Sequence, residues 1–250
     1  MIKEPKLTIV SVSDIKIKKT INALIKSNIS LKPYKTILFS SKAVSLNKKE
    51  AEIIDLVKIK KISSIKDYSS FIIYSLYKYI KTSHILIVQW DGYIINPEKW
   101  DPNFLKYDYV GAPFIPREND KNYCRDRNGA FYIIGNGGFS LRSRRLLEAP
   151  TKFKLKDNIK LTNFNEDGFF SVFHRKFLES KGLIWAPFDI SKKFSIESPL
   201  SINELKDLPL GFHGKKMYYL LILIKLKNFK LFKLIFCFFN LINFPFFGKK

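Results

Sequence analysis

Residues 85–92 read Ile-Leu-Ile-Val-Gln-Trp-Asp-Gly, and this stretch decides the fold. It begins with an aliphatic run, which is typical of a strand buried on both faces of a parallel sheet. Asp91 and Gly92 follow at the carboxyl end of the strand, where open α/β sheets bind their ligands. Gly92 has no side chain to keep a ligand from the backbone. The stretch therefore predicts an α/β fold with Asp91 at the mouth of a binding cleft.

The rest of the first half alternates in the same way between short apolar strands and helices. The expected strands span residues 7–12, 35–39, 56–62 and 85–88, and the expected helices span residues 17–27 and 67–80. This alternation predicts βαβ units and a Rossmann-like, mostly parallel central sheet. The loops after the first two strands then open on the edge that carries Asp91, and Asp14 lies in the first of them.

The second half is expected to place further strands and helices after a long region of irregular loops. A strand is expected at 131–134, a helix at 141–147 with Ser140 as its N-cap, a helix at 169–180 and a strand at 183–186. The chain is therefore predicted to form one domain over residues 1–215, followed by a basic, apolar, helical tail over residues 216–250.

The composition suits one large α/β domain with a strong positive charge. The chain has 250 residues, of which 46% are hydrophobic and 15% aromatic, so a sizeable core is expected. Its net charge of +22 indicates a polyanionic partner (nucleic acid, anionic lipid or a phosphorylated substrate) or a surface of solvated lysines. All seven arginines lie between Arg117 and Arg175. This clustering favours an anion site in the middle of the chain, unless it reflects codon usage alone.

The ends of the chain bear on its location. Cys124 and Cys237 have no metal or redox spacing, and no signal peptide is evident, so a cytoplasmic protein is expected. From Leu208 to Lys250 there are eight lysines and no acidic residue, and lysines interrupt the long apolar runs. An interfacial helix on the anionic inner membrane face is favoured over a transmembrane span. A helix docked on the core and a dimer contact are the alternatives.

Two motifs have the character of a ligand site. Asp91 follows Gln89 at the end of a buried strand, where a carboxylate can hold a divalent cation that bridges two phosphates. Residues 135–140 read Gly-Asn-Gly-Gly-Phe-Ser, and three glycines between a strand and a helix would leave N–H groups open to a ligand. The run is neither GxGxxG nor a P-loop, and a tight structural turn is the alternative.

Two further motifs supply a candidate base and a candidate metal ligand. Glu166 and Asp167 precede an expected helix, so either is a candidate general base, although acidic residues there also favour the helix dipole. His213 lies near the end of the folded part, and imidazole is a good ligand for manganese. A lone histidine is more often structural, and the other two histidines are weaker candidates.

Taken in order, these motifs resemble those of an uncharacterised family. They read QWDG at 89–92, GNGGFSLRSRRLLE at 135–148, Glu-Asp at 166–167 and GFHG at 211–214. The family consists of bacterial and viral proteins, is described as a domain of unknown function, and is regarded as GT-A-type glycosyltransferases. The resemblance implies a GT-A-like α/β fold and, more distantly, a likeness to metal-dependent galactosyltransferase-like enzymes.

The resemblance also assigns roles by position. Asp91 would hold Mn²⁺ or Mg²⁺ on the diphosphate of a nucleotide-sugar donor, and His213 would complete the metal shell. Asp167, or Glu166, would be the catalytic base of an inverting displacement, and Asp14 would lie near the nucleotide base. The other residues expected at the donor and acceptor site are Gln89, Trp90, Gly92, Asn136, Gly137, Gly138 and Phe139.

One position departs from the family pattern. The usual metal motif is Asp-x-Asp, and its first position is Gln89 in this chain. Glutamine is neutral and is a weaker metal ligand, so the resemblance leaves metal dependence open. An arginine or lysine is the alternative source of positive charge.

These features predict a glycosyltransferase that moves a sugar from a nucleotide-sugar donor to a glycan or lipid-linked acceptor, in cell-surface polysaccharide biosynthesis. One alternative is a catalytically inactive GT-A-like interaction module, which Gln89 motivates. Another is a basic nucleic-acid-binding protein. The sequence lacks the aromatic residues alternating with Arg or Lys on one face that are typical of that class, so nucleic acid is not the expected partner.

Overall fold

The computed structural model describes residues 7–113, 125–126, 128–133, 135–155, 165–197 and 205–225. Its main feature is a six-stranded sheet with the order β3-β2-β1-β4-β6-β5. The strands are β1 (Leu7–Val12), β2 (Lys35–Ser40), β3 (Asp55–Lys58), β4 (His84–Ile87), β5 (Tyr109–Pro113) and β6 (Gly135–Ser143). The strands from β3 to β4 are parallel, while β6 runs antiparallel to both β4 and β5. The mostly parallel sheet expected from the sequence is confirmed.

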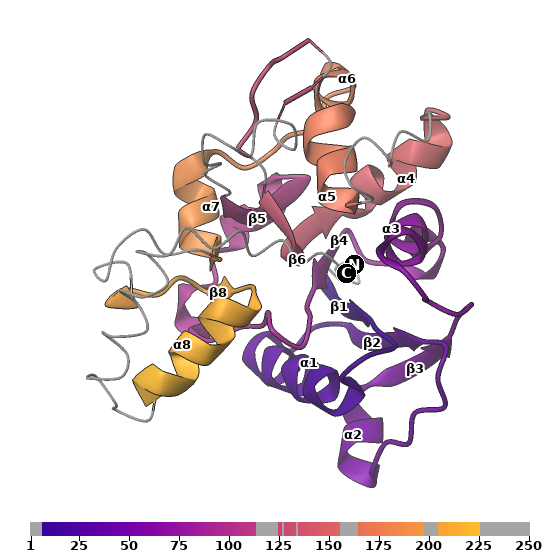
Figure 1. Ribbon diagram of the computed structural model, residues 1–250, viewed down its shortest axis with the longest axis vertical. Coiled ribbons are helices and arrows are strands. Elements are labelled where there is room, and N and C mark those ends of the chain that lie inside the picture. Colours follow the sequence, from indigo (N-terminus) through magenta and orange to yellow (C-terminus); the bar gives the residue numbers. More distant parts are fainter. Residues whose placement is uncertain are drawn as a thin grey trace, which may run out of the picture.

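Helices cover both faces of this sheet (Figure 1). They are α1 (Ile17–Leu31), α2 (Lys48–Ile53), α3 (Ile65–Tyr74), α4 (Arg144–Lys152), α5 (Glu166–Gly168), α6 (Arg175–Ser180), α7 (Phe188–Phe194) and α8 (Lys215–Lys225). Neighbouring residues of β1 face opposite ways: Ile9 shares a core cluster with Leu24 of α1, and Val10 shares one with Ile72 of α3. Because both faces are covered, every residue of β4 is buried.

Several predicted elements are found with shifted ends. The helix expected at 17–27 extends to Leu31, and the strand expected at 56–62 is the shorter β3. The helix expected at 67–80 is α3 followed by a 3-10 helix, Leu76–Tyr79. The helix expected at 169–180 is a π-helical segment, Phe169–Phe173, followed by α6. Two more 3-10 helices span Pro97–Lys99 and Pro102–Lys106.

The prediction for the glycine-rich run is wrong. Residues 135–143 form strand β6, so the glycines lie inside the sheet rather than in a loop before a helix. The strand forms because its backbone pairs with β4 on one side and β5 on the other. The helix then begins at Arg144, and its N-cap is Ser143, whose Oγ accepts a hydrogen bond of 3.1 Å from the N–H of Leu146. Ser140 instead donates its hydroxyl to the carbonyl of Gly137 at 2.8 Å.

In the described part of the chain, two other expected strands are not formed, and each is represented by one isolated β-bridge. Within the described residues, the strand expected at 131–134 is represented by a bridge between Arg125 and Phe131. The strand expected at 183–186 is represented by a bridge between Trp185 and Tyr109 of β5. The edge position of β5 leaves room for this single contact.

The C-terminal part forms a second, two-stranded sheet and a helix. Strands β7 (Ser195–Ile196) and β8 (Gly211–Phe212) pair in parallel, and α8 follows directly. Met217 and Leu220 of α8 are buried in a cluster with Phe212, so this helix docks on the core. Residues 226–250, most of the predicted tail, lie outside the described residues, as do both cysteines. No helix in the described part of the chain is long and apolar enough to cross a membrane.

Candidate functional site

The candidate site begins at a tight turn after β4. The N–H of Gln89 donates to the carbonyl of Gly92 at 2.9 Å, and the N–H of Gly92 donates back to the carbonyl of Gln89 at 3.0 Å. Trp90 and Asp91 lie at the tip of this turn. The turn is anchored because the N–H of Val88 donates to β1 at Val10, 2.9 Å away. Asp91 thus lies at the carboxyl edge of the sheet, and its side chain is buried.

His213 reaches the same turn from the far end of the chain. The N–H of Gly214 donates to the carbonyl of Asp91 at 2.9 Å, which holds the segment after β8 against the turn. The imidazole Nε2 then lies 3.2 Å from Oε1 of Gln89 and 3.9 Å from Oδ1 of Asp91. The structure therefore brings together Gln89, Asp91 and His213.

Glu197 holds the other side of the His213 ring and was not found from the sequence. Its Oε1 lies 3.3 Å from Nδ1 of His213. The amide of Gln89 donates from Nε2 to the hydroxyl of Tyr68 at 3.1 Å, which turns Oε1 toward the imidazole. Both ring nitrogens therefore face oxygen atoms, which suits the imidazolium form. Burial opposes the charge, but the hydrogen bond and charge of Glu197, with Asp91, raise the pKa of His213.

Asp91 is a buried acceptor with an unused oxygen. Its Oδ1 has no hydrogen-bond partner among the described residues. Burial raises the pKa of Asp91, while the charges of His213, Lys16 and Lys215 act in the opposite direction. Buried carboxylate oxygens are rarely left without a partner. This atom is therefore the clearest sign of a ligand in the described part of the chain.

Glycines allow the imidazole to pack against the backbone of strand β6 and of the turn after β4. A Cβ at Gly138 would lie 2.1 Å from Nε2 of His213, and a Cβ at Gly92 would lie 2.8 Å from its Cδ2. Neither distance is compatible with a side chain. Both glycines were expected at the site from the sequence, and the structure places both against His213, with Gly138 in β6 rather than in a loop.

The neighbouring glycine, Gly137, contacts the acidic pair. Its N–H donates to Oδ2 of Asp167 at 3.2 Å, and a Cβ there would lie 2.3 Å from Oε1 of Glu166. Glu166 accepts a hydrogen bond of 2.7 Å from Nη2 of Arg142, and both side chains are buried. Glu166 is thus held in a buried ion pair, whereas Asp167 is half-buried beside the backbone of β6.

The arginines do not form a free anion site in the part of the chain that is described. Arg142, Arg144, Arg145 and Arg175 each pair with a carboxylate, namely Glu166, Glu148, Asp108 and Glu179. Arg125 donates to the carbonyl of Gly129 at 2.8 Å. Arg117 and Arg127 lie outside the described residues. The predicted anion site is therefore not found among the four paired arginines, because a carboxylate compensates the charge of each one.

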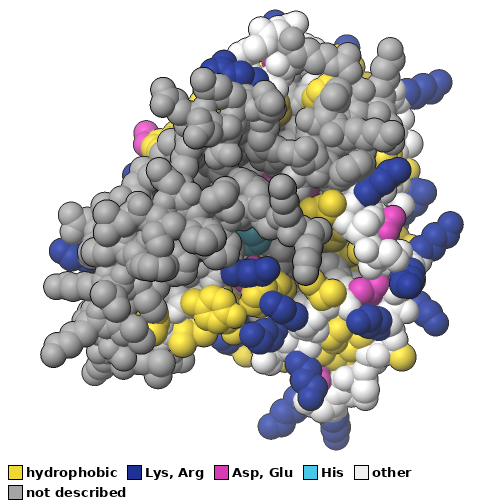
Figure 2. All heavy atoms as spheres, in the orientation of Figure 1, with side chains coloured by type: hydrophobic (Ala, Val, Ile, Leu, Met, Phe, Trp, Pro, Cys, Tyr) yellow, Lys and Arg dark blue, Asp and Glu magenta, His cyan; other side chains and the backbone are white. Residues whose placement is uncertain are grey.

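Lysines bring positive charge to the turn instead. Lys16, at the start of α1, places Nζ 3.5 Å from the ring centroid of Trp90 and has a left-handed backbone with φ of 48°. Lys19 lies 5.3 Å from the same ring. Burial and the charges of Lys215 and Lys19 lower the pKa of Lys16. Figure 2 shows Lys and Arg side chains gathered over α1 beside a hydrophobic patch.

Two predicted site residues have other surroundings. Asp14 accepts hydrogen bonds from both Ser40 and Ser41 and from the N–H of Ile62, at 2.6 to 3.1 Å. Burial alone would raise the pKa of Asp14, but these hydrogen bonds outweigh that effect and lower the pKa to about 2. Its carboxylate ties three loops together. Phe139 is fully buried and stacks on Phe194 at 5.1 Å, so it lies in the core and not on the floor of the site.

The remaining predicted residues lie around the turn and the start of β6. The ring of Trp90 packs edge-on against Tyr218 of α8 at 5.5 Å. Oδ1 of Asn136 accepts a hydrogen bond of 2.7 Å from the N–H of Gly138 and so shapes the strand opposite His213. Asn136 supports the site through this contact.

The donor atoms at the turn fit a small divalent cation with few protein ligands. The described residues contain no group of three or more His, Cys, Asp or Glu suited to a metal. The unpartnered Oδ1 of Asp91, Nε2 of His213 and Oε1 of Gln89 nevertheless lie side by side. Carboxylate and amide oxygens suit manganese or magnesium, and the imidazole of His213 could add to a manganese shell once its Nε2 has lost its proton.

Solved structures show the fold of the chain. The galactosyltransferase LgtC, solved in complex with donor and acceptor sugar analogues, is 13% identical, with 83% of this chain and 87% of that chain covered and a TM-score of 0.53. A glycosyltransferase involved in the glycosylation of the major capsid of PBCV-1 is 17% identical, covering 84% of this chain and 93% of that chain, with a TM-score of 0.48. The likeness to LgtC shows that this α/β fold is similar to that of the GT-A glycosyltransferases.

The mannosyltransferase PcManGT from Pyrobaculum calidifontis, in complex with GDP-Man and Mn²⁺, is 11% identical over 59% of this chain, with a TM-score of 0.37. This chain spans 47% of the length of that protein. No curated protein sequence matches the chain.

A family model described as "Protein of unknown function (DUF5672)" matches residues 51–213. The matched segment contains Asp91, Gly138, Asp167 and His213, the residues that meet at the candidate site. Because it spans more than half of the 250 residues, the chain belongs to this DUF5672 family.

Proposed function

We propose that the protein is a glycosyltransferase that takes its sugar from a nucleotide-sugar donor. The observation that carries this proposal is the buried Oδ1 of Asp91 at the carboxyl edge of β4, which lies 3.9 Å from His213 and has no hydrogen-bond partner among the described residues. That edge is where open α/β sheets bind nucleotides. The likeness of the fold to LgtC supports the same reading.

The donor diphosphate is proposed to bind at the turn after β4. Asp91, His213 and Gln89 would hold a Mn²⁺ or Mg²⁺ ion, which supplies positive charge to the leaving diphosphate when bound. Lys16 and Lys215 supply a second source of charge from the chain itself, since both act electrostatically on Asp91. Because position 89 is a glutamine and not a second acidic metal ligand, these lysines would supply part of the positive charge at the diphosphate.

The base is proposed to be Asp167. Glu166 is committed to Arg142 in a buried ion pair, whereas Asp167 is half-buried beside Gly137. In an inverting displacement, the acceptor hydroxyl oxygen attacks the anomeric carbon as its bond to the diphosphate breaks. Asp167 takes the hydroxyl proton, and the nucleoside diphosphate leaves with the bonding electrons.

The acceptor is proposed to be a glycan or lipid-linked glycan at the inner membrane face, as in cell-surface polysaccharide biosynthesis. The basic, apolar sequence of residues 226–250 supports this placement, because such segments bind anionic membrane surfaces. The protein would then be cytoplasmic and peripheral to the membrane.

Thermal-shift titration with uridine, guanosine and cytidine diphosphates tests this function. We expect one nucleotide to raise the melting temperature, and more strongly with Mn²⁺ than with EDTA, because a ligand that binds only the folded state stabilises it. The matching nucleotide-sugar should then be hydrolysed slowly to nucleoside diphosphate and free sugar. Failure of all three nucleotides to bind would refute the proposal. Binding without any hydrolysis or transfer would favour the inactive interaction module.

A further inference from the structure

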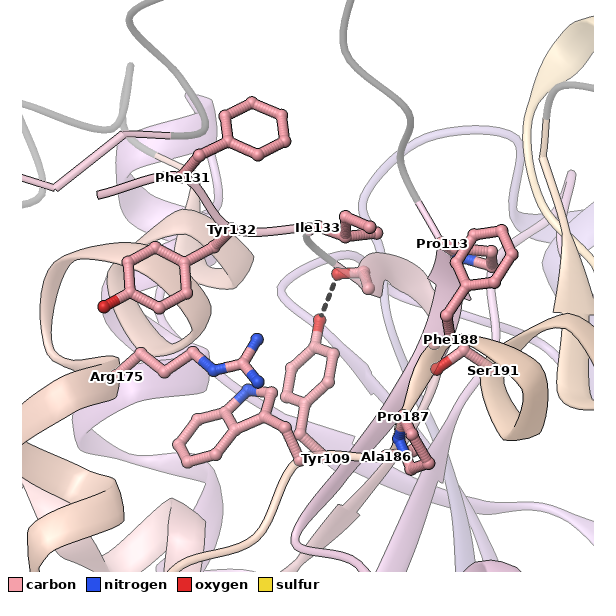
Figure 3. A pocket seen from close by; sticks show the side chains of 13 residues that line it. Tyr109, Pro113, Phe131, Tyr132, Ile133, Arg175, Ala186, Pro187, Phe188 and Ser191 are labelled. Carbon is pink, nitrogen blue, oxygen red and sulfur yellow. Dashed lines mark hydrogen bonds between the residues drawn. The ribbon is translucent and has the colours of Figure 1, made fainter. Parts of the chain in front are cut away.

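A cavity lies between β5, α6 and α7. It has a volume of about 330 Å³. Tyr109, Tyr132 and Phe188 line it, as Figure 3 shows, and Trp185 lines it as well. This volume is at the lower end of the range for small-molecule sites, which suits one or two ring-sized groups.

Aromatic rings dominate this cavity and remain partly exposed at its rim. Phe131 is 47% exposed and Phe188 is 37% exposed, and Ile133 beside them is 42% exposed. Trp185 is fixed in the floor, because its Nε1 donates to Ser171 at 2.9 Å. Exposed apolar side chains around a cavity mark a binding surface. Rigid aromatic faces of this kind offer an apolar platform for the C–H face of a sugar ring.

Arg175 provides the polar group of the cavity. Its guanidinium lies 5.3 Å from the ring centroids of both Tyr132 and Trp185, and Figure 3 shows Arg175 beside Tyr132. Its Nε donates to Glu179 at 2.9 Å. The guanidinium has four further N–H donors, which match hydroxyl or carboxylate oxygens. The cavity thus combines apolar platforms with a fixed hydrogen-bond donor.

The cavity and the proposed base both contact the first residues of β6. Gly135 lines it, and Gly137, two residues further along β6, donates its N–H to Asp167. The hydroxyl of Tyr109, at the centre of Figure 3, donates to the carbonyl of Gly135 at 2.8 Å. A ligand in the cavity therefore lies on one side of Gly137, while the Asp91 turn lies on the other, beyond Gly138.

We propose that this cavity binds a sugar ring of the acceptor and presents one of its hydroxyls to the donor site. This inference rests on the proposed glycosyltransferase function. The ring stacks on the aromatic side chains, and Arg175 donates hydrogen bonds to its oxygens. The cavity thereby binds acceptors that present a sugar ring, and it does not bind a nucleobase.

Binding of free monosaccharides to the full-length protein tests the cavity directly. Glucose, galactose, mannose and glucuronic acid are titrated in saturation-transfer NMR, in wild type and in the variants Arg175→Gln and Tyr132→Ala. The matched control is Arg144→Gln, because Arg144 makes the same i,i+4 pair with Glu148 outside this cavity. Melting temperatures verify that each variant is folded.

We expect at least one sugar to bind to wild type and to the control alike. Arg175→Gln should weaken that binding about tenfold, as the loss of a charge-assisted hydrogen bond does. A larger loss for glucuronic acid than for glucose would assign the contact to a carboxylate, and an equal loss would assign it to hydroxyls. The proposal is overturned if no sugar binds, if both cavity variants bind like wild type, or if uridine displaces the sugar.

The outcome is separable from that of the proposed function. Donor hydrolysis depends on Asp91 and is measured on the same wild-type preparation without any sugar acceptor. Hydrolysis without sugar binding would overturn the acceptor cavity alone. Sugar binding that responds to Arg175, in a protein that binds no nucleotide, would overturn the transferase and leave a sugar-binding site.

Discussion

Gln89 shows how one residue sets the charge of the site. Its amide spans two partners, because it donates to Tyr68 and faces the imidazole of His213 with its oxygen. A carboxylate in its place would bring a second negative charge next to Asp91. With Gln89, Asp91 is the single carboxylate of the turn, and its neighbours His213 and Lys16 carry the compensating charge.

Asp91→Asn should separate function from stability. We expect donor hydrolysis to fall at least about 100-fold, in the range seen when one transition-state stabilising group is lost. The melting temperature at pH 7 should be unchanged or higher. Burial raises the pKa of Asp91, so its ionised form costs folding free energy at pH 7, and a neutral amide removes that cost.

The control for Asp91→Asn is Asp207→Asn, because the Asp207 side chain is 89% exposed and pairs with Lys99 at the surface. It should change neither activity nor melting temperature, since exposed ion pairs contribute little. Full donor hydrolysis by Asp91→Asn would disprove the role of Asp91.

Gly138→Ala should displace the imidazole of His213. The added Cβ would lie 2.1 Å from Nε2, so strand and ring cannot both stay in place. We expect a destabilisation of about 1–3 kcal/mol, as for other overpacked sites, together with weaker nucleotide binding. Urea denaturation of Gly138→Ala, His213→Ala and the double variant forms a cycle. Gly138→Ala should lower the free energy of unfolding less in the His213→Ala background, where the imidazole is absent. If the effects of the two substitutions simply add, the predicted contact is contradicted.

Among the elements, α1 has a feature that links backbone strain to the site. Both of its flanking residues, Lys16 and Lys32, have left-handed backbone with φ of 48° and 46°. Such a conformation costs a lysine roughly 1 kcal/mol relative to glycine. At Lys32 it is an ordinary helix C-cap. At Lys16 it places an ammonium group over Trp90, next to Asp91.

The two ends of α1 therefore form a matched pair of variants. Lys16→Gly and Lys32→Gly should both keep or slightly raise the melting temperature, because glycine adopts this backbone without strain. Only Lys16→Gly should weaken nucleoside diphosphate binding, by about fivefold to tenfold, as expected for one lost charge contact. Titration calorimetry without metal measures this difference. Equal affinities for both variants would remove Lys16 from the donor site.

Strand β6 contributes to the site because its successive residues face opposite sides of the sheet. Gly138 faces His213, whereas Phe139 turns to the opposite side and packs on Phe194. The buried pair of Arg142 and Glu166 then ties β6 to α5 and thereby places Asp167 next to Gly137. These contacts explain why adjacent residues of one motif have different roles.

At the scale of the whole molecule, the segment after β8 has two parts. Residues up to 225 belong to α8, whose Met217 and Leu220 are buried in the core. Deletion of residues 226–250 should release the protein from vesicles containing anionic lipid while leaving its melting temperature unchanged. Deletion from residue 216 should also lower the melting temperature, because it uncovers the cluster around Phe212. Vesicle co-sedimentation that survives the shorter deletion would refute the membrane proposal.

Local patterns in the sequence were enough to predict the parallel half of the fold. The strands β1, β2 and β4 are short apolar runs and the helix α1 has helical spacing, and Asp91 lies just beyond the buried strand β4, as expected. The glycine run was misassigned, since glycine has no periodicity of its own to distinguish a strand from a loop. The run continues the strand of residues 140–142, which pair with both β4 and β5, and Gly135 itself pairs with Pro113 of β5.

The sequence by itself determined the α/β class, the buried strand before the Asp91 turn, and the motifs that contain Gly138, Asp167 and His213. Only the tertiary structure decided which of these residues touch. Gln89 and His213 are 124 residues apart in the chain, and Arg142 and Glu166 are 24 apart. Contacts over such separations depend on how strands pair and how loops close, and local residue pattern does not encode them. For the same reason, only the structure revealed Glu197 beside His213 and the aromatic cavity around Arg175.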